Sequence, residues 1–153
     1  MVLSACETGL GAIHLGEGVF GLRRAFMVAG AKTLVMSLWK VPDLATAFLM
    51  DRFYDNLLTR GLDRDLALST AQRSTRDATV AELKKDWLTP AMIEQFAAGD
   101  ANARGHLQQL AQQSDDHRPF ESPFFWGAFI CQGDPSPLRS AKTAGESGPQ
   151  ARA

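Results

Sequence analysis

Residues 2–11 read Val2-Leu3-Ser4-Ala5-Cys6-Glu7-Thr8-Gly9-Leu10-Gly11. A short apolar run that leads into a cysteine and then into glycines predicts a buried β-strand followed by a loop. The strand would deliver the thiol of Cys6 to its carboxyl end. In an open α/β sheet, ligands and chemistry collect at that edge. Cys6 is therefore placed as a nucleophile would be.

The position of Cys6 alone leaves two interpretations open. Free cysteine is among the most buried residue types, so Cys6 can equally be a structural residue of the core. A nucleophilic cysteine must be a thiolate or have a base within hydrogen-bond reach, because a free thiol has a pKa near ~8.5. Backbone N–H groups of the following loop would suit the oxyanion of such a reaction.

Three histidines are candidate bases, namely His14, His106 and His117. His14 is nearest to Cys6 in the sequence and lies on the glycine-rich loop, where a histidine is more often simply solvated. The other two lie in a polar segment, and a base has to reach the proton that it removes. The histidines lack the spacing of metal ligands, and no phosphate-binding glycine motif is present. We therefore expect neither a metal nor a cofactor.

Composition narrows the class of protein. The 153 residues are 45% hydrophobic with a net charge of −1, which suits a single domain with a real core. Basic residues are interspersed with acidic ones, so we expect no nucleic-acid partner. No apolar run approaches the roughly 20 residues of a membrane span, and the start of the chain lacks signal-peptide features. We expect no membrane partner, a cytoplasmic location and reduced cysteines.

The residues after the opening strand predict a helix and then a second strand. Apolar side chains recur at helical spacing from Glu17 or Gly18, and Gly30 is predicted to end that helix. Residues 32–39 form a nearly continuous apolar run, typical of a strand covered on both faces. Strand, helix and strand together predict a right-handed βαβ unit.

Two further helices are predicted next. Asp43 is expected to cap a helix that runs to about Thr59 and stops at Gly61, and another helix follows from Asp63. Arg64, Arg73 and Arg76 are expected to point outward from the second helix. The side chains that we expect to be buried are Ala47, Met50, Tyr54, Leu57 and Leu58 in the first, and Leu66, Ala67, Thr70 and Ala71 in the second.

The second half of the chain changes in character. Residues 77–119 are polar, with only local amphipathic pieces, and are interpreted as a surface insertion that is helical in parts. An apolar run from Phe124 to Cys131 predicts a third strand, ended by Gly133-Asp134-Pro135. Beyond Pro135 the tail is expected to be disordered.

The end of the second predicted strand, Ser37-Leu38-Trp39, is a candidate substrate-binding segment. It should lie beside the end of the first strand if the two are neighbours. An extended segment there can pair with a peptide through main-chain hydrogen bonds, while the side chain of Trp39 forms one wall of a pocket. The alternative is that Trp39 is simply a core residue.

Several motifs follow one another at close spacing over residues 2–71 and again over residues 123–134. They include Leu3-Ser4-Ala5-Cys6-Glu7-Thr8-Gly9, Gly16-Glu17-Gly18, Ser37-Leu38-Trp39-Lys40-Val41, Pro123-Phe124-Phe125-Trp126-Gly127-Ala128-Phe129 and Gly133-Asp134. Together they resemble the CHAT domain, a caspase-like, separase-related family that usually follows tetratricopeptide repeats.

The resemblance implies an α/β fold of the caspase-hemoglobinase type, a three-layer sandwich whose parallel-dominated sheet lies between helices. It implies a cysteine endopeptidase that acts on a protein or peptide substrate through a Cys–His dyad. Cys6 matches the nucleophile of the family. Ser37, Leu38 and Trp39 match the segment that lines the substrate groove in caspase-like enzymes.

The sequence departs from the family in one respect. The family places its catalytic histidine in a His-Gly context on an earlier strand, whereas only five residues precede Cys6 here. We therefore expect residues 1–134 to be the C-terminal half of a CHAT domain, with the insertion at about 77–119 and a tail over 135–153. This half would be unstable and inactive alone, and a tetratricopeptide-repeat region is expected upstream.

Two other functions remain open. The chain could be a catalytically inactive fragment or pseudoenzyme that acts as a protein-interaction module, with Cys6 retained only as core. It could also be an intact small α/β hydrolase that uses Cys6 and His14.

Overall fold

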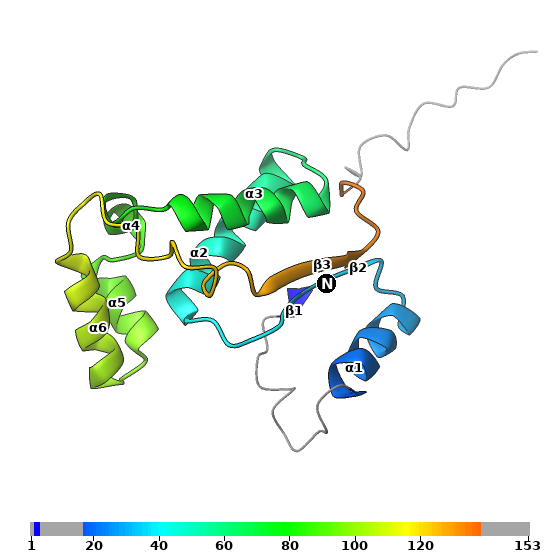
Figure 1. Ribbon diagram of the computed structural model, residues 1–153, viewed down its shortest axis with the longest axis horizontal. Coiled ribbons are helices and arrows are strands. Elements are labelled where there is room, and N and C mark those ends of the chain that lie inside the picture. Colours follow the sequence, from blue (N-terminus) through cyan, green and yellow to red (C-terminus); the bar gives the residue numbers. More distant parts are fainter. Residues whose placement is uncertain (1, 4–16, 139–153) are drawn as a thin grey trace, which may run out of the picture.

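A small mixed sheet lies between helices in the computed structural model, which describes residues 2–3 and 17–138 (Figure 1). Within these residues the sheet has the order β1 (Val2–Leu3), β2 (Thr33–Ser37), β3 (Phe129–Gly133). β1 pairs with β2 in parallel, and β3 pairs with β2 in antiparallel orientation. The family resemblance implied a sheet dominated by parallel pairs, whereas the described sheet has one parallel and one antiparallel pair.

The first part of the fold confirms the predicted strand–helix–strand order. Helix α1 (Glu17–Val28) joins the parallel strands β1 and β2, and Gly30 follows it with φ +93°. This φ lies in the left-handed region that glycine adopts without strain, so it suits the end of a helix. In Figure 1, α1 lies below the sheet, while α2 and α3 lie above it.

Helix α2 (Asp43–Tyr54) continues into a π-helical turn, η1 (Asp55–Thr59), and Gly61 follows with φ +65°. The predicted end at Thr59 is thus confirmed. The predicted cap is wrong, because Pro42 occupies the capping position and no side-chain cap is formed there among the described residues. Asp43 is instead the first residue of the helix, where its negative charge interacts favourably with the positive end of the helix dipole.

The buried face of α2 and η1 also differs from the predicted one. Leu57 is buried, but Ala47 and Met50 are only half-buried, and Tyr54 and Leu58 are exposed. The helix is apolar around much of its circumference, so its neighbours decide which side is covered. The covered side chains are Leu44, Ala45, Phe48, Leu49 and Phe53.

Helix α3 (Arg64–Asp77) packs against α2 and buries Ala67 and Ala71 as predicted. Leu66 is 45% exposed, contrary to the prediction. Arg64 does not point freely outward, because its side chain is only 13% exposed and donates to the backbone oxygen of Asp134 at 3.0 Å. The beginning of α3 is thereby tied to the chain just after β3.

The polar segment after α3 forms α4 (Val80–Asp86), α5 (Pro90–Ala97) and α6 (Ala101–Ala111). Thr79, Thr89 and Asp100 cap these helices by accepting from backbone N–H groups of their first turns. Val80, Leu83, Leu88 and Ile93 are buried, whereas α6 buries no residue. The α4–α5 part of the segment therefore adds side chains to the core.

An aromatic cluster joins this segment to α2. The ring of Phe48 lies 5.6 Å from that of Trp87 and 6.3 Å from that of Phe120, and Trp87 stacks on Phe96 at 6.4 Å. The guanidinium of Arg52 lies over the Phe48 ring at 4.9 Å and pairs with Glu82 at 2.9 Å. Such contacts add to the free energy of burying the rings themselves.

The third strand begins later than its apolar sequence predicts. Residues 124–127 form a turn, and β3 starts only at Phe129. The N–H groups of Trp126 and Gly127 donate to the Pro123 carbonyl at 3.3 and 2.7 Å. A Cβ on Gly127 would lie 2.8 Å from that same oxygen, so only glycine fits. This tight turn keeps the first half of the apolar run out of the sheet.

Replacing Phe48 tests the role of the aromatic cluster. Phe48 is fully buried, so Phe48→Ala should lower the free energy of unfolding of the full-length protein by about 3–5 kcal/mol. The midpoint of urea denaturation measures this loss. Leu58→Ala, at a side chain that is 65% exposed, is the control and should change stability by less than about 1 kcal/mol. Equal effects of the two variants would contradict this description of the core.

Candidate functional site

The strand that precedes the predicted nucleophile in the sequence and the strand that leads into the predicted groove residues are neighbours in the sheet. Cys6 and His14 fall outside the described residues. The strand that leads toward Cys6 is described at Val2 and Leu3, and Leu3 lies opposite Met36 of β2. Because β1 and β2 are parallel, their carboxyl ends meet at one edge of the sheet. Ser37 is the last residue of β2 at that edge.

Ser37, Leu38 and Trp39 lie together where β2 leaves the sheet. Ser37 is half-buried and lies opposite Phe129 of β3. The Leu38 N–H donates to the Ala128 carbonyl at 2.9 Å, which extends the pairing with the β3 segment by one step. The side chain of Leu38 is 52% exposed and that of Trp39 is 39% exposed. Trp39 is thus not a core residue.

Trp39 is held by the turn that precedes β3. Its indole Nε1 donates to the Phe124 carbonyl at 2.9 Å, and the side chain of Phe124 is itself 49% exposed. We call Leu38, Trp39 and Phe124 the apolar rim. Large apolar side chains that gather at an exposed sheet edge are typical of a surface that binds another molecule.

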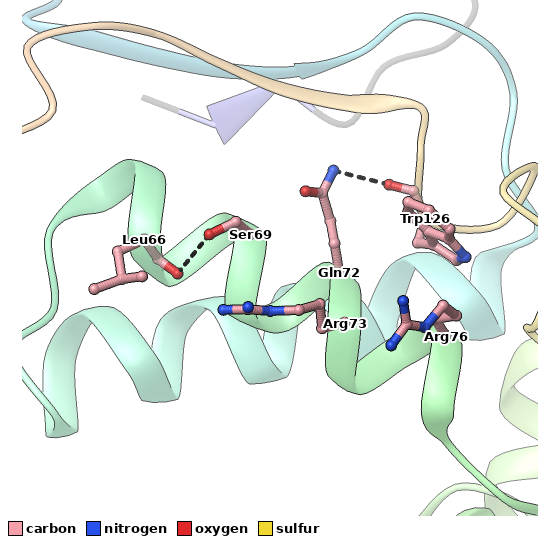
Figure 2. Close-up of a pocket in the computed structure, with 6 residues that line it drawn as sticks. All are labelled: Leu66, Ser69, Gln72, Arg73, Arg76 and Trp126. Atoms are coloured by element: carbon pink, nitrogen blue, oxygen red, sulfur yellow. Dashed lines mark hydrogen bonds between the residues drawn. The ribbon is translucent and has the colours of Figure 1, made fainter.

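Helix α3 fixes the other side of the same turn. The side-chain amide of Gln72 donates to the Trp126 carbonyl at 3.0 Å (Figure 2) and to the Phe129 carbonyl at 2.9 Å. Phe124 and Gln72 were not singled out as site residues from the sequence. Phe124 lay inside a predicted strand, and a glutamine on a polar helix face carries no local signal for such a contact.

The comparisons with known proteins decide the family. A family profile described as the CHAT domain matches residues 1–134. The chain belongs to the CHAT domain family. This family is related to caspase-like peptidases.

The chain is also similar to a short part of two much longer proteins. The chain is similar to tetratricopeptide repeat protein 28 of Homo sapiens, with 35% identity over 71 residues, which are 46% of this chain. It is also similar to tetratricopeptide repeat protein 28 of Mus musculus, with 30% identity over 87 residues, or 57% of this chain. The matched parts are 3% and 4% of those relatives. No solved structure matches the chain.

Two histidines of this CHAT chain, His106 and His117, lie among the described residues. His106 is exposed on α6, a helix that packs against α4 and α5 and lies well apart from the sheet in Figure 1. His117 is exposed too, and its backbone carbonyl accepts the Val80 N–H at 2.9 Å. Both histidines thus belong to the helical segment after α3.

Cys131, the described cysteine, lies on β3 and packs against the edge of the core. Burial raises the pKa of its thiol above the ordinary value, and the nearby charge of Asp65 adds to the shift. The thiol therefore stays protonated near neutral pH, as expected of a structural cysteine.

The described part of the chain holds no cluster of three or more histidine, cysteine or acidic side chains arranged to bind a metal ion. A search of the same residues finds no helix long and apolar enough to cross a membrane.

Replacing Trp39 tests how the apolar rim of this CHAT domain is held. Trp39→Phe keeps an aromatic ring but removes the Nε1 donor, so the Phe124 carbonyl loses its 2.9 Å partner. The local free energy of unfolding should fall by about 0.5–1.5 kcal/mol, which is measured as faster amide hydrogen exchange at Leu38 and Gly127. Trp126→Phe is the matched control, because the indole of Trp126 makes only a 3.4 Å bond to Glu121. Unchanged exchange in Trp39→Phe would show that this hydrogen bond does not hold the turn.

Proposed function

We propose that this chain is part of a CHAT cysteine endopeptidase in which Cys6 is the nucleophile and Ser37, Leu38 and Trp39 line the substrate groove. The observation that carries the proposal is the parallel pairing of β1 with β2, in which Leu3 lies opposite Met36. Cys6 follows Leu3 by three residues in the sequence, and three residues of chain span at most about 11 Å. The parallel register supports the proposal that the thiol and the apolar rim share one edge of the sheet.

The reaction proposed for this edge is acyl transfer. The Cys6 thiolate attacks the carbonyl carbon of a peptide bond, and backbone N–H groups stabilise the oxyanion. A histidine protonates the leaving amine, and water then releases the acyl group from the sulfur. As the family resemblance implies, that histidine would come from a His-Gly motif outside these 153 residues.

The apolar rim suggests how a peptide would be held. The Leu38 N–H already donates to Ala128, so it is not available to pair with a substrate strand. Contact would come instead from the exposed side chains of Leu38, Trp39 and Phe124. Such a groove favours substrates with apolar side chains beside the scissile bond.

The wider setting is also part of the proposal. Helices on both sides of the sheet in Figure 1 are compatible with a caspase-like three-layer sandwich. The relatives are named for tetratricopeptide repeats, which supports a repeat region upstream that selects the protein substrate in the cytoplasm.

A second candidate function is protein binding without cleavage. The apolar rim favours it as well, since an exposed apolar edge can dock a partner whether or not a thiolate lies beside it. In that case Cys6 would be a residue of the sheet core.

Mutation of the two cysteines separates these functions. In the full-length protein, Cys6→Ala should lower peptide-bond cleavage by roughly four orders of magnitude or more, because no other group replaces the nucleophile. Cys131→Ala is the control and should keep cleavage within about twofold. Cleavage that survives Cys6→Ala would refute the peptidase mechanism. A wild-type protein that binds peptide but never cleaves it would favour the interaction module.

Alkylation tests whether Cys6 is activated. Iodoacetamide should label Cys6 faster than Cys131 at neutral pH, since only the thiolate reacts and burial raises the pKa of Cys131. Labelling of Cys131 should increase only as the pH rises beyond the ordinary range of a thiol. Mass spectrometry of the labelled peptides reads both rates. Equal rates at the two cysteines would argue against an activated site.

A further inference from the structure

A shallow cavity of about 440 Å³ opens beside α3 and is also lined by Trp126, which lies in the same turn as Phe124 of the apolar rim. Figure 2 shows the side chains that line it, which come from α3 and from that turn. None of them is acidic. They are Leu66, Ser69, Gln72, Arg73, Arg76 and Trp126.

The two arginines of the cavity differ in their partners. Arg76 donates to both carboxylate oxygens of Asp77 at 2.9 Å, and these bonds lower the pKa of Asp77 below its ordinary value. Arg73 makes one long bond, of 3.4 Å, to the hydroxyl of Thr70. Among residues 17–138, no carboxylate lies within 4.0 Å of the Arg73 guanidinium. Arg73 therefore keeps most of its donors for another molecule.

Arg73 has further charged residues on its other side. Arg73 also lines a second hollow of about 510 Å³, together with Arg52 and Arg60. The acids of that hollow, Asp77 and Glu82, are already paired with Arg76 and Arg52. Arg60 is paired with Asp55 as well, so among the described residues Arg73 is the one arginine of the two hollows without a carboxylate within 4.0 Å. An anion that approaches Arg73 therefore meets an uncompensated positive charge.

Gln72 adds an acceptor of fixed orientation to the cavity. Its amide nitrogen donates to two backbone carbonyls, so the amide cannot turn over without losing both bonds. The oxygen Oε1 therefore stays on the other side of the amide, and Figure 2 shows it turned away from Trp126. Leu66, 45% exposed, and the indole of Trp126 supply apolar walls.

We propose that this cavity binds an acidic peptide segment of another protein. A carboxylate of the peptide accepts from the Arg73 guanidinium, a peptide N–H donates to Gln72 Oε1, and apolar side chains of the peptide pack against Leu66 at one end and Trp126 at the other. A free phosphate would use Arg73 but leave the acceptor and the apolar walls unused. The proposal does not depend on Cys6 or on any proteolytic activity.

Fluorescence polarisation with the full-length protein tests the proposal. The probe is a fluorescein-labelled hexapeptide in which glutamate alternates with leucine. Arg73→Gln should weaken its binding by about tenfold or more, and Arg73→Lys, which keeps the charge but loses the planar fork, should weaken it less. Arg118→Gln is the matched control, because Arg118 is exposed, lies 3.9 Å from Asp77 and does not line the cavity. It should leave binding within about twofold.

Three results would overturn the proposal. Equal binding of the hexapeptide with glutamine in place of glutamate would show that no carboxylate is recognised. An equal loss in Arg73→Gln and Arg118→Gln would show that only the overall charge matters. Displacement of the probe by inorganic phosphate as readily as by unlabelled acidic hexapeptide would show an anion site that does not recognise peptides.

Discussion

The rest of the described structure depends on the burial of β2 between two strands. The strand pairs with β1 on one side and with β3 on the other. Its buried residues are Thr33, Leu34, Val35 and Met36. Successive side chains of a strand point to opposite faces, so a shift of register by one residue would turn each of these buried side chains to the other face. The register of β2 therefore fixes where the chain leaves the sheet, and with it the positions of Ser37, Leu38 and Trp39.

Local signals in the sequence were enough to predict β2, α1 and the helix ends near Gly30 and Gly61. Apolar runs and left-handed glycines act over a few neighbouring residues, so they can be recognised without the rest of the fold. The late start of β3 was not predictable in this way, because it depends on the Pro123–Gly127 turn and on Gln72, which lies more than fifty residues earlier. The exposure of Trp39 has the same non-local origin, since its partner is the Phe124 carbonyl. The role of Cys6 as a nucleophile stays a prediction from its sequence position and the family resemblance, because Cys6 lies outside the described residues.

The segment after α3 shows why composition is a poor guide to burial. Its many charged and amide side chains predict a surface, and α6 indeed buries no residue. Its few large apolar residues are nevertheless spaced so that short, capped helices turn them inward, and Trp87 lies between Phe48 and Phe96. A handful of well-placed side chains is sufficient, because one buried aromatic ring removes a large apolar area from water.

The apolar rim and the cavity beside α3 both include a residue of the segment 123–129, namely Phe124 and Trp126, yet they are expected to bind independently. A ligand in the cavity could change the rim only by favouring a second arrangement of this segment. The segment is instead held from both sides, by the Trp39 indole at Phe124 and by the Gln72 amide at Trp126 and Phe129. Gly127 leaves no room for the turn to tighten further, because the Pro123 oxygen already approaches its backbone. A second arrangement would have to break these three hydrogen bonds together. The contacts therefore favour a rigid turn that presents two separate binding surfaces over one that transmits a change between them.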